Sequence, residues 1–423
     1  MVSVMSMWAE GPSKRECESR FGDQRLSPGA PCPLQKPASV YLDNACTSYP
    51  KPPCVADAVV HYLSHGGYNV NRASYEAAYD VEDGVLECRE LLADMFGVAN
   101  PGLVAFTRCV TESLNLVIKG LLKPGDHVVV SSMEHNAVMR SLTQLASRDV
   151  TFTRVSCAED GSLDVAQVER ALTPATRLVV MTHASNVCGT VLPLGEVGEL
   201  AHAHGIPFVV DAAQTAGVLD VSLEALHADA VCFTGHKGLL GPQGIGGVAL
   251  TAELAGTLDP LVVGGTGSFS DSEETPSLMP DKLEAGTLNL PGIMGLSAGL
   301  RWLGERGVES VRAHELDLTE RLIEALLPLE AQGFVGVVGR RDTEGRVGVV
   351  SVTTPGLDCA MVAHELDARH GVQTRVGLHC APSAHKSLGT FPTGTIRFSV
   401  GPFNTSDDVD AAVAALADAC RHI

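Results

Sequence analysis

The segment FVVDAAQ occupies residues 208–214, and the segment AVCFTGHK occupies residues 230–237. Each is a short apolar run that ends in polar residues, and LVVMTHASN at 178–186 repeats the pattern. Short apolar runs without alternation are typical of strands that are buried on both faces. Helix-like stretches such as 194–204 separate several of these runs. We therefore predict an α/β fold whose mostly parallel sheet is covered by helices on both faces.

Further elements extend this pattern along the chain. Apolar runs at 127–131 and 245–250 predict two more strands. Apolar residues recur at spacings of three and four from Val81 to Met95, which predicts a helix that ends at Gly97. Residues 111–122 predict a second helix, because Lys-Pro-Gly follows it directly.

Three regions of different texture suggest the domain organisation. Residues 1–38 are rich in Pro, Gly, Ser and charge without any period, which indicates a flexible N-terminal arm. Residues 39–290 form the predicted large domain. Residues 291–423 combine linking helices with a smaller α+β domain, which also takes part of the N-terminal segment. Its strands are predicted at 347–353 and 395–400, and its helices at 359–370 and 406–421.

Composition excludes several classes of protein. Of the 423 residues, 45% are apolar, which is ample for a large core. The net charge of -20 and the absence of a basic stretch argue against nucleic acid as a partner. No apolar run is long enough to span a membrane, and the N-terminus does not resemble a signal peptide, so we expect a cytoplasmic protein. The twelve cysteines are scattered, and none forms a CxxC motif typical of zinc ribbons.

Polar residues follow the predicted strands at the edge where parallel sheets bind ligands. Any one of these segments could be an ordinary turn or helix cap. Together they place a lysine, an aspartate, two amides and two histidines at one edge, including Lys237 and Asp211. A lysine that forms a Schiff base and a carboxylate that holds a pyridinium nitrogen are the residues that pyridoxal phosphate requires. The start of the helix at Thr111 would supply backbone N–H groups for its phosphate.

A competing motif is Gly244-Ile-Gly-Gly-Val-Ala249, which matches the dinucleotide-binding fingerprint. That fingerprint must follow a strand and open a helix. Here residues 248–250 themselves have the character of a strand, which argues against a nicotinamide cofactor.

Eight motifs give the sequence from Val40 onward a clear resemblance to a known family. The chain resembles the class V aminotransferase-like enzymes of fold type I, and among them the second-group cysteine desulfurases and selenocysteine lyases. This resemblance implies a seven-stranded type of sheet in the large domain and pyridoxal 5'-phosphate as the cofactor. The motifs are YLDNACTSYPKP at 41–52, TRCVTESLN at 107–115, MEHNA at 133–137, SNVCGT at 185–190, VDAAQ at 210–214, TGHK at 234–237, EAGTLN at 284–289 and RVGLHCAP at 375–382.

The resemblance also implies roles for individual residues around the cofactor. Lys237 would form the Schiff base, Asp211 would hold the pyridinium nitrogen, Gln214 would donate to the ring hydroxyl and His135 would stack on the ring. The phosphate site and the remaining contacts are expected from Cys109, Val110, Thr111, Asn186, Thr234 and His236, with Gly286 and Thr287 reaching in from the second subunit of a homodimer.

Cys380 differs from the other cysteines because it lies in a segment with the character of a loop. Nearby Arg375, His379, His385 and a lysine could make its surroundings positive and favour a thiolate. His379, Cys380 and His385 could alternatively ligate a metal, but no fourth ligand stands at a useful spacing, so we predict no metal site. In the family this position carries the persulfide cysteine.

Arg397 lies on a predicted strand, where an arginine at the surface edge is the simplest interpretation. The family resemblance instead makes Arg397 the fork that receives the substrate carboxylate, together with Arg375 and Asn186. The expected function is an L-cysteine desulfurase that makes alanine and passes sulfur from Cys380 to an acceptor protein. Selenocysteine lysis, β-elimination, epimerisation and transamination stay open as alternatives, as does a non-catalytic sulfur-carrier scaffold, although that scaffold would not need Lys237 or Asp211.

Overall fold

The computed structural model describes residues 39–70 and 75–423. The predicted N-terminal arm at 1–38 therefore lies outside the described residues. In the part of the chain that is described, no helix has the length and apolar character needed to cross a membrane.

A seven-stranded sheet forms the centre of the large domain, with strand order β2-β8-β7-β6-β5-β3-β4. Every neighbouring pair from β7 to β4 is parallel, whereas β8 is antiparallel to both of its neighbours. The predicted α/β fold with a mostly parallel sheet is confirmed. The strands are β2 (Val104–Thr107), β3 (His127–Ser131), β4 (Thr151–Val155), β5 (Thr176–Thr182), β6 (Phe208–Asp211), β7 (Ala230–Thr234) and β8 (Gly246–Leu250).

The apolar strand residues divide between two cores because successive side chains of a strand point to opposite faces. On β3, Val129 packs in one core, while Val128 and Val130 pack in the other. On β7, Val231 and Cys232 divide in the same way. Both faces of the sheet are therefore covered, which explains why these strands are continuous apolar runs in the sequence.

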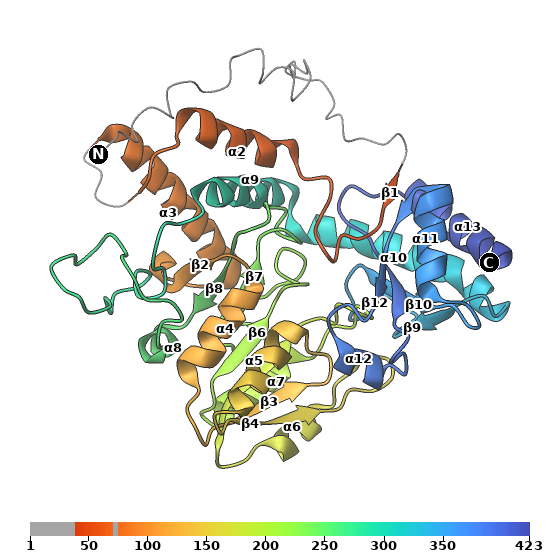
Figure 1. The fold of residues 1–423 in the computed structure, drawn as a ribbon, viewed down its shortest axis with the longest axis horizontal. Helices are drawn as coiled ribbons and strands as arrows, with labels where there is room; N and C mark the ends of the chain where they lie inside the picture. The colour runs from red at the N-terminus through yellow and green to blue at the C-terminus, as the bar shows by residue number, and fades with distance from the viewer. Residues whose placement is uncertain (1–38, 71–74) are drawn as a thin grey trace, which may run out of the picture. The chain divides into compact units, whose positions relative to one another are not determined.

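Helices α4 and α5 cover one face of this sheet, and α3, α7 and α9 contribute to the core on the other face (Figure 1). The predicted end of α3 is confirmed, because Gly97 adopts a left-handed conformation with φ of 67°. The helices of this region are α2 (Pro53–His65), α3 (Glu76–Phe96), α4 (Val110–Leu121), α5 (Asn136–Ala146), α6 (Val165–Ala171), α7 (Leu194–Ala203), α8 (Ala252–Thr257) and α9 (Leu290–Arg306), with a short 3-10 turn η1 (Pro101–Leu103).

A separate core forms around a four-stranded antiparallel sheet with order β12-β13-β10-β9. The N-terminal strand β1 pairs with β11, and Leu42 packs into this second core, so the start of the described chain joins its C-terminal part. The elements are β1 (Val40–Tyr41), α10 (Val308–Ala331), β9 (Gly336–Val338), β10 (Val349–Thr353), α11 (Cys359–His370), β11 (Val372–Gln373), β12 (Arg375–Gly377), α12 (Pro382–Ser387), β13 (Thr395–Ser399) and α13 (Ser406–His422).

Two glycines of the dinucleotide-like motif allow close packing around a strand. Gly246 and Gly247 lie on β8, as the sequence predicted for this segment, and no helix opens there. A Cβ atom on Gly246 would lie 2.9 Å from the Cα of Cys109, and one on Gly247 would lie 2.5 Å from the ring of Phe233. Close packing therefore requires glycine at both positions.

Candidate active site

The carboxyl ends of the parallel strands bring the predicted polar residues to one edge of the sheet. Asp211 is the last residue of β6, and it pairs in register with Thr182 on β5 and Cys232 on β7. Asn186 follows β5, and His135 follows β3. Segments far apart in the sequence thus meet where open parallel sheets bind their ligands.

Lys237 and Asp211 form the charged centre of this edge. Asp211 is buried, and burial raises the pKa of its carboxyl, against the opposing effects of the Ala213 amide and Lys237. Burial lowers the pKa of Lys237 to about 8, although Asp211 acts in the other direction. A lysine amine with a pKa this close to neutrality can take up and release protons during a reaction.

His135 is held as a neutral ring at the N-cap of α5. Its Nδ1 accepts a hydrogen bond of 3.0 Å from the amide of Ala137, so the ring proton lies on Nε2. Burial lowers the pKa of His135 to about 4, and Lys237 and two arginines add to this effect. A neutral imidazole offers a flat face that can stack on an aromatic ring.

Glu134 supports the segment that carries His135. Its carboxyl is fully buried and accepts hydrogen bonds of 2.6 Å from the hydroxyl of Ser131 and 3.0 Å from the amide of Thr182. Burial raises the pKa of Glu134 to about 8, so the carboxyl is protonated at neutral pH. It ties the end of β3 to the end of β5.

Two buried polar atoms at this edge have no hydrogen-bond partner among the described residues. They are the hydroxyl of Thr234, at the end of β7, and Nδ1 of His236. Burial lowers the pKa of His236 to about 4, with smaller effects from Lys237 and Lys51. Unpaired buried polar groups are costly, so these two atoms mark a place where a ligand can supply the missing partner.

The N-terminus of α4 lies beside this place. β8 pairs with both β2 and β7, so Gly246 lies between Thr107 and Thr234. Helix α4 begins at Val110, and its N-cap residue Cys109 forms no side-chain cap. The amides of Glu112 and Ser113 donate to the carbonyl of Cys109, so the backbone N–H groups of Val110 and the exposed Thr111 are the ones available to an anion.

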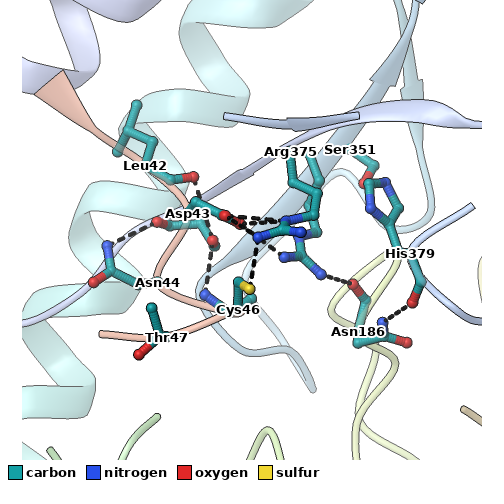
Figure 2. A network of polar contacts seen from close by, with 12 residues as sticks. Leu42, Asp43, Asn44, Cys46, Thr47, Asn186, Ser351, Arg375 and His379 are labelled. Atoms are coloured by element: carbon teal, nitrogen blue, oxygen red, sulfur yellow. Dashed lines mark hydrogen bonds and ion pairs between the residues drawn. The ribbon is translucent and has the colours of Figure 1, made fainter. Parts of the chain in front are cut away.

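Arg397, on β13, is buried and binds Asp43. Its Nη2 donates to Asp43 at 2.9 Å, and its Nη1 donates to the carbonyl of Asn186 at 3.0 Å. Arg375, on β12, donates to the other oxygen of Asp43 at 2.8 Å and to the sulfur of Cys46 at 2.7 Å (Figure 2). One carboxylate thus pairs with two arginines that come from neighbouring strands.

Cys380 is exposed, and its loop is fixed by backbone contacts on both sides. The side chain of Asn186 donates to the carbonyl of His379 at 2.7 Å, and the amide of Asn136 donates to the carbonyl of Cys380 at 2.7 Å. His379 and Cys380 both adopt positive φ angles, of 47° and 56°, which non-glycine residues rarely do. The rest of the site therefore holds this loop in place.

The expected positive surroundings of Cys380 need a correction. Burial holds the pKa of His379 far below its usual range and lowers the pKa of His385 to about 4, so both rings are neutral. The guanidinium of Arg375 pairs with Asp43. The sequence shows the four basic residues, but only burial and pairing decide which of them carry free charge.

Three further predicted residues are Gln214, Gly286 and Thr287. Gln214 donates to the carbonyl of Ala45, a residue of the first motif, at 3.1 Å. Gly286 and Thr287 are exposed, and the amide of Gly286 donates to the carbonyl of Gly265 at 2.8 Å. These two positions are therefore open to a neighbouring subunit.

A sequence profile of the family described as aminotransferase class-V matches residues 40–412. The chain belongs to this family. The predicted resemblance is confirmed, and it covers almost all of the described chain.

Several relatives and solved structures that resemble this aminotransferase class-V chain are named cysteine desulfurase. A probable cysteine desulfurase from Methanothermobacter thermautotrophicus is 35% identical over 374 residues, covering 88% of this chain and 92% of that protein. A cysteine desulfurase from Haloferax volcanii is 32% identical over 397 residues, covering 91% and 90%. The apo structure of cysteine desulfurase from Thermococcus onnurineus NA1 superposes with a TM-score of 0.85 at 33% identity, covering 91% of this chain and 95% of that one.

Two residues of this class V chain were not predicted as parts of the site. Asp43 lies within the first motif, and its position directly after the apolar segment 40–42 was the available signal. Glu134 precedes His135 in the MEHNA motif, and no role of its own was predicted for it from the sequence. Its burial and its bonds to two strands appear only in the folded chain.

Proposed function

We propose that this protein is a pyridoxal phosphate-dependent L-cysteine desulfurase that leaves the sulfur of cysteine on Cys380. The observation that carries the proposal is the exposed Cys380 on a loop bonded to Asn186 and Asn136, both at the edge that holds Lys237 and Asp211. The relatives named cysteine desulfurase support the same activity. A non-catalytic scaffold would have no use for the buried Lys237 and Asp211.

The residues present fit the cofactor. The unpartnered atoms of Thr234 and His236, with the uncapped start of α4, would hold the phosphate. Asp211 would bind the pyridinium nitrogen, and His135 would stack on the ring. Gln214 would donate a hydrogen bond to the ring hydroxyl. When bound, pyridoxal phosphate supplies an electron sink for the charge that develops at the substrate Cα.

Arg397 would bind the carboxylate of cysteine. Its buried Nε has no partner among the described residues, so one donor of the guanidinium is available. Asp43 keeps the charge of Arg397 paired when no substrate is present. A bond between Arg397 and the substrate carboxylate would contribute about 1.5–3 kcal/mol. We also assign Asn186 and Arg375 to the substrate side, because they contact Arg397 and Asp43.

Lys237 and Cys380 would perform the bond changes. The Lys237 amine takes the Cα proton and later returns a proton to the product. The Cys380 thiolate attacks the substrate sulfur, so that the new S–S bond forms as the C–S bond breaks and its electron pair stays with the carbon fragment. Alanine leaves, and a persulfide remains on Cys380 for an acceptor protein.

A homodimer is part of this proposal, because Gly286 and Thr287 are exposed and would complete the phosphate site of the partner. The domain boundary near residue 290 and the cytoplasmic location stay predictions.

The decisive experiment compares Cys380→Ser with Cys54→Ser, which changes another exposed cysteine. Alanine release is followed with cysteine, cysteine sulfinate and selenocysteine as substrates, together with sulfide, sulfite and selenide. We expect Cys380→Ser to lose persulfide formation and alanine release from cysteine, because a serine hydroxyl is a poor nucleophile toward sulfur. Cys54→Ser should retain both.

Two results would contradict the desulfurase proposal. One is alanine release from cysteine by Cys380→Ser at the unmodified rate. The other is wild-type protein that turns over only selenocysteine or cysteine sulfinate, which would favour one of the alternative reactions. Binding of cysteine to Cys380→Ser, seen as a change in the cofactor spectrum, is the control for an intact site.

A further inference from the structure

The segment Thr47–Lys51, between β1 and α2, contacts the backbone of the loop that carries Lys237. Lys51 Nζ donates to the carbonyl of His236 at 2.7 Å. The amide of Ser48 donates to the same carbonyl at 3.0 Å, and the hydroxyl of Thr47 does so at 3.1 Å. Donors from one short segment therefore converge on the peptide that directly precedes Lys237.

A second route leads from Lys51 to Lys237 itself. Lys51 Nζ also donates to the hydroxyl of Ser48 at 2.6 Å. That hydroxyl lies 3.0 Å from the carbonyl of Lys237 and 3.3 Å from the carbonyl of His236. Because a hydroxyl has one hydrogen, and the His236 carbonyl already has other donors, its hydrogen is best placed on the Lys237 carbonyl. Lys51 thus fixes the carbonyls of both His236 and Lys237.

The surroundings of Lys51 suit this contact. Ser48 is buried, and Lys51 is partly buried against the loop. Burial lowers the pKa of Lys51 to about 8, so the side chain is a cation at neutral pH and donates strong bonds to both oxygens. Hydrogen bonds from a charged donor hold their partners more firmly than neutral ones do.

We propose that Lys51 is a positioning residue for Lys237, which it acts on through the His236 carbonyl and the Ser48 hydroxyl. By fixing the two carbonyls at the base of the side chain, it sets the direction in which the Lys237 amine meets the cofactor aldehyde. This inference rests on the proposed function, because that proposal makes Lys237 the lysine that binds the cofactor.

The test measures binding of two cofactor forms to Lys51→Met. Pyridoxal phosphate has the aldehyde that reacts with Lys237, whereas pyridoxamine phosphate has an amine in its place. We expect Lys51→Met to weaken binding of pyridoxal phosphate roughly tenfold and to slow the appearance of its visible absorbance. Binding of pyridoxamine phosphate should change by less than about twofold, because that ligand does not depend on the Lys237 amine. Lys51→Arg should restore most of the loss.

The matched control is Lys282→Met. Lys282 also donates to two backbone carbonyls, those of Ala255 and Gly256, at 2.9 and 3.1 Å. Its loss removes the same kind of contact elsewhere, and it should leave the binding of both cofactor forms unchanged. Thermal unfolding of each variant shows whether the fold is intact.

A second variant keeps the test decisive if Lys51→Met does not fold. Ser48→Ala removes only the hydroxyl between Lys51 and the Lys237 carbonyl, and we expect the same selective loss at roughly threefold. Equal weakening of both cofactor forms, or wild-type binding of pyridoxal phosphate by the folded variants, would overturn the inference. Failure of the wild-type protein to bind pyridoxal phosphate would instead overturn the proposed function.

Discussion

Two sides of the candidate site differ in how their buried polar groups are paired within the protein. The strand-end side, formed by His135, Asp211, Thr234, His236 and Lys237, leaves buried polar atoms without partners in the described chain. On the arginine side, formed by Arg375, Arg397 and Asp43, the charges are already paired, and only Nε of Arg397 has no partner among the described residues of that group.

Under the proposed function, this difference follows from how long each ligand stays. A resident cofactor can serve as a permanent partner, so the protein need not provide one at Thr234 and His236. A substrate leaves in every cycle, and an unpaired buried guanidinium would then be very costly. Asp43 provides a partner for Arg397 in the meantime. Under that proposal, the cofactor completes the strand-end side and the substrate exchanges on the arginine side.

The largest effect on turnover of cysteine is expected from a substitution on the strand-end side. Lys237→Ala should remove the visible absorbance of bound pyridoxal phosphate and lower turnover of cysteine at least about a thousandfold, because the proposed mechanism uses the Lys237 amine to move the Cα proton. Absorbance spectra and alanine release measure both effects. Lys282→Ala is the control. A Lys237→Ala protein that keeps its colour and its turnover would refute the cofactor assignment.

An intermediate effect is expected on the arginine side. Arg397→Gln should raise the KM for cysteine roughly 10–100-fold, with a smaller change in kcat, because the carboxylate loses a charged partner. Arg375→Gln is the matched comparison, since Arg375 binds the same Asp43 but its side chain is 45% exposed. We expect its effect on KM to be about fivefold or less. Equal effects of the two variants would contradict the distinction between a buried substrate-binding arginine and an exposed supporting one.

The smallest effect on turnover is expected beneath the strand-end side, at Glu134. Its folded pKa of about 8 exceeds the usual value for a glutamate, so folding takes up a proton between these two values. The stability that depends on this proton is complete at acid pH and is lost as the pH rises toward 8.

Between pH 5 and pH 8 this linkage costs the wild-type protein roughly 3 kcal/mol of unfolding free energy, and we expect Glu134→Gln not to show that loss. Urea unfolding at both pH values measures it. Glu315→Gln, which changes another buried carboxyl with a pKa of about 8, should have a similar effect on stability, although Glu315 lies on α10 and not at the ends of β3 and β5. An unaltered pH dependence in Glu134→Gln would show that its carboxyl is ionised in the folded protein.

The sequence predicted those strands that are buried on both faces, because such strands are continuous apolar runs. The strand at 127–131 is the clearest case, because it has two covered faces and neighbours on both sides. The edge strand β4 gave no such signal. Its segment TFTRV is largely exposed, and its strand conformation depends on pairing with β3.

For the site, the sequence by itself determined which chemical groups are present and which strand ends carry them. Lys237, Asp211 and Cys380 could be singled out because motif and position along the chain are local properties. Only the tertiary structure decided how Asp43 and Lys51 are used, because their partners lie far away in the sequence. It also decided that the histidines near Cys380 are neutral. Charge depends on burial and on neighbouring groups, and both exist only once distant segments have packed together.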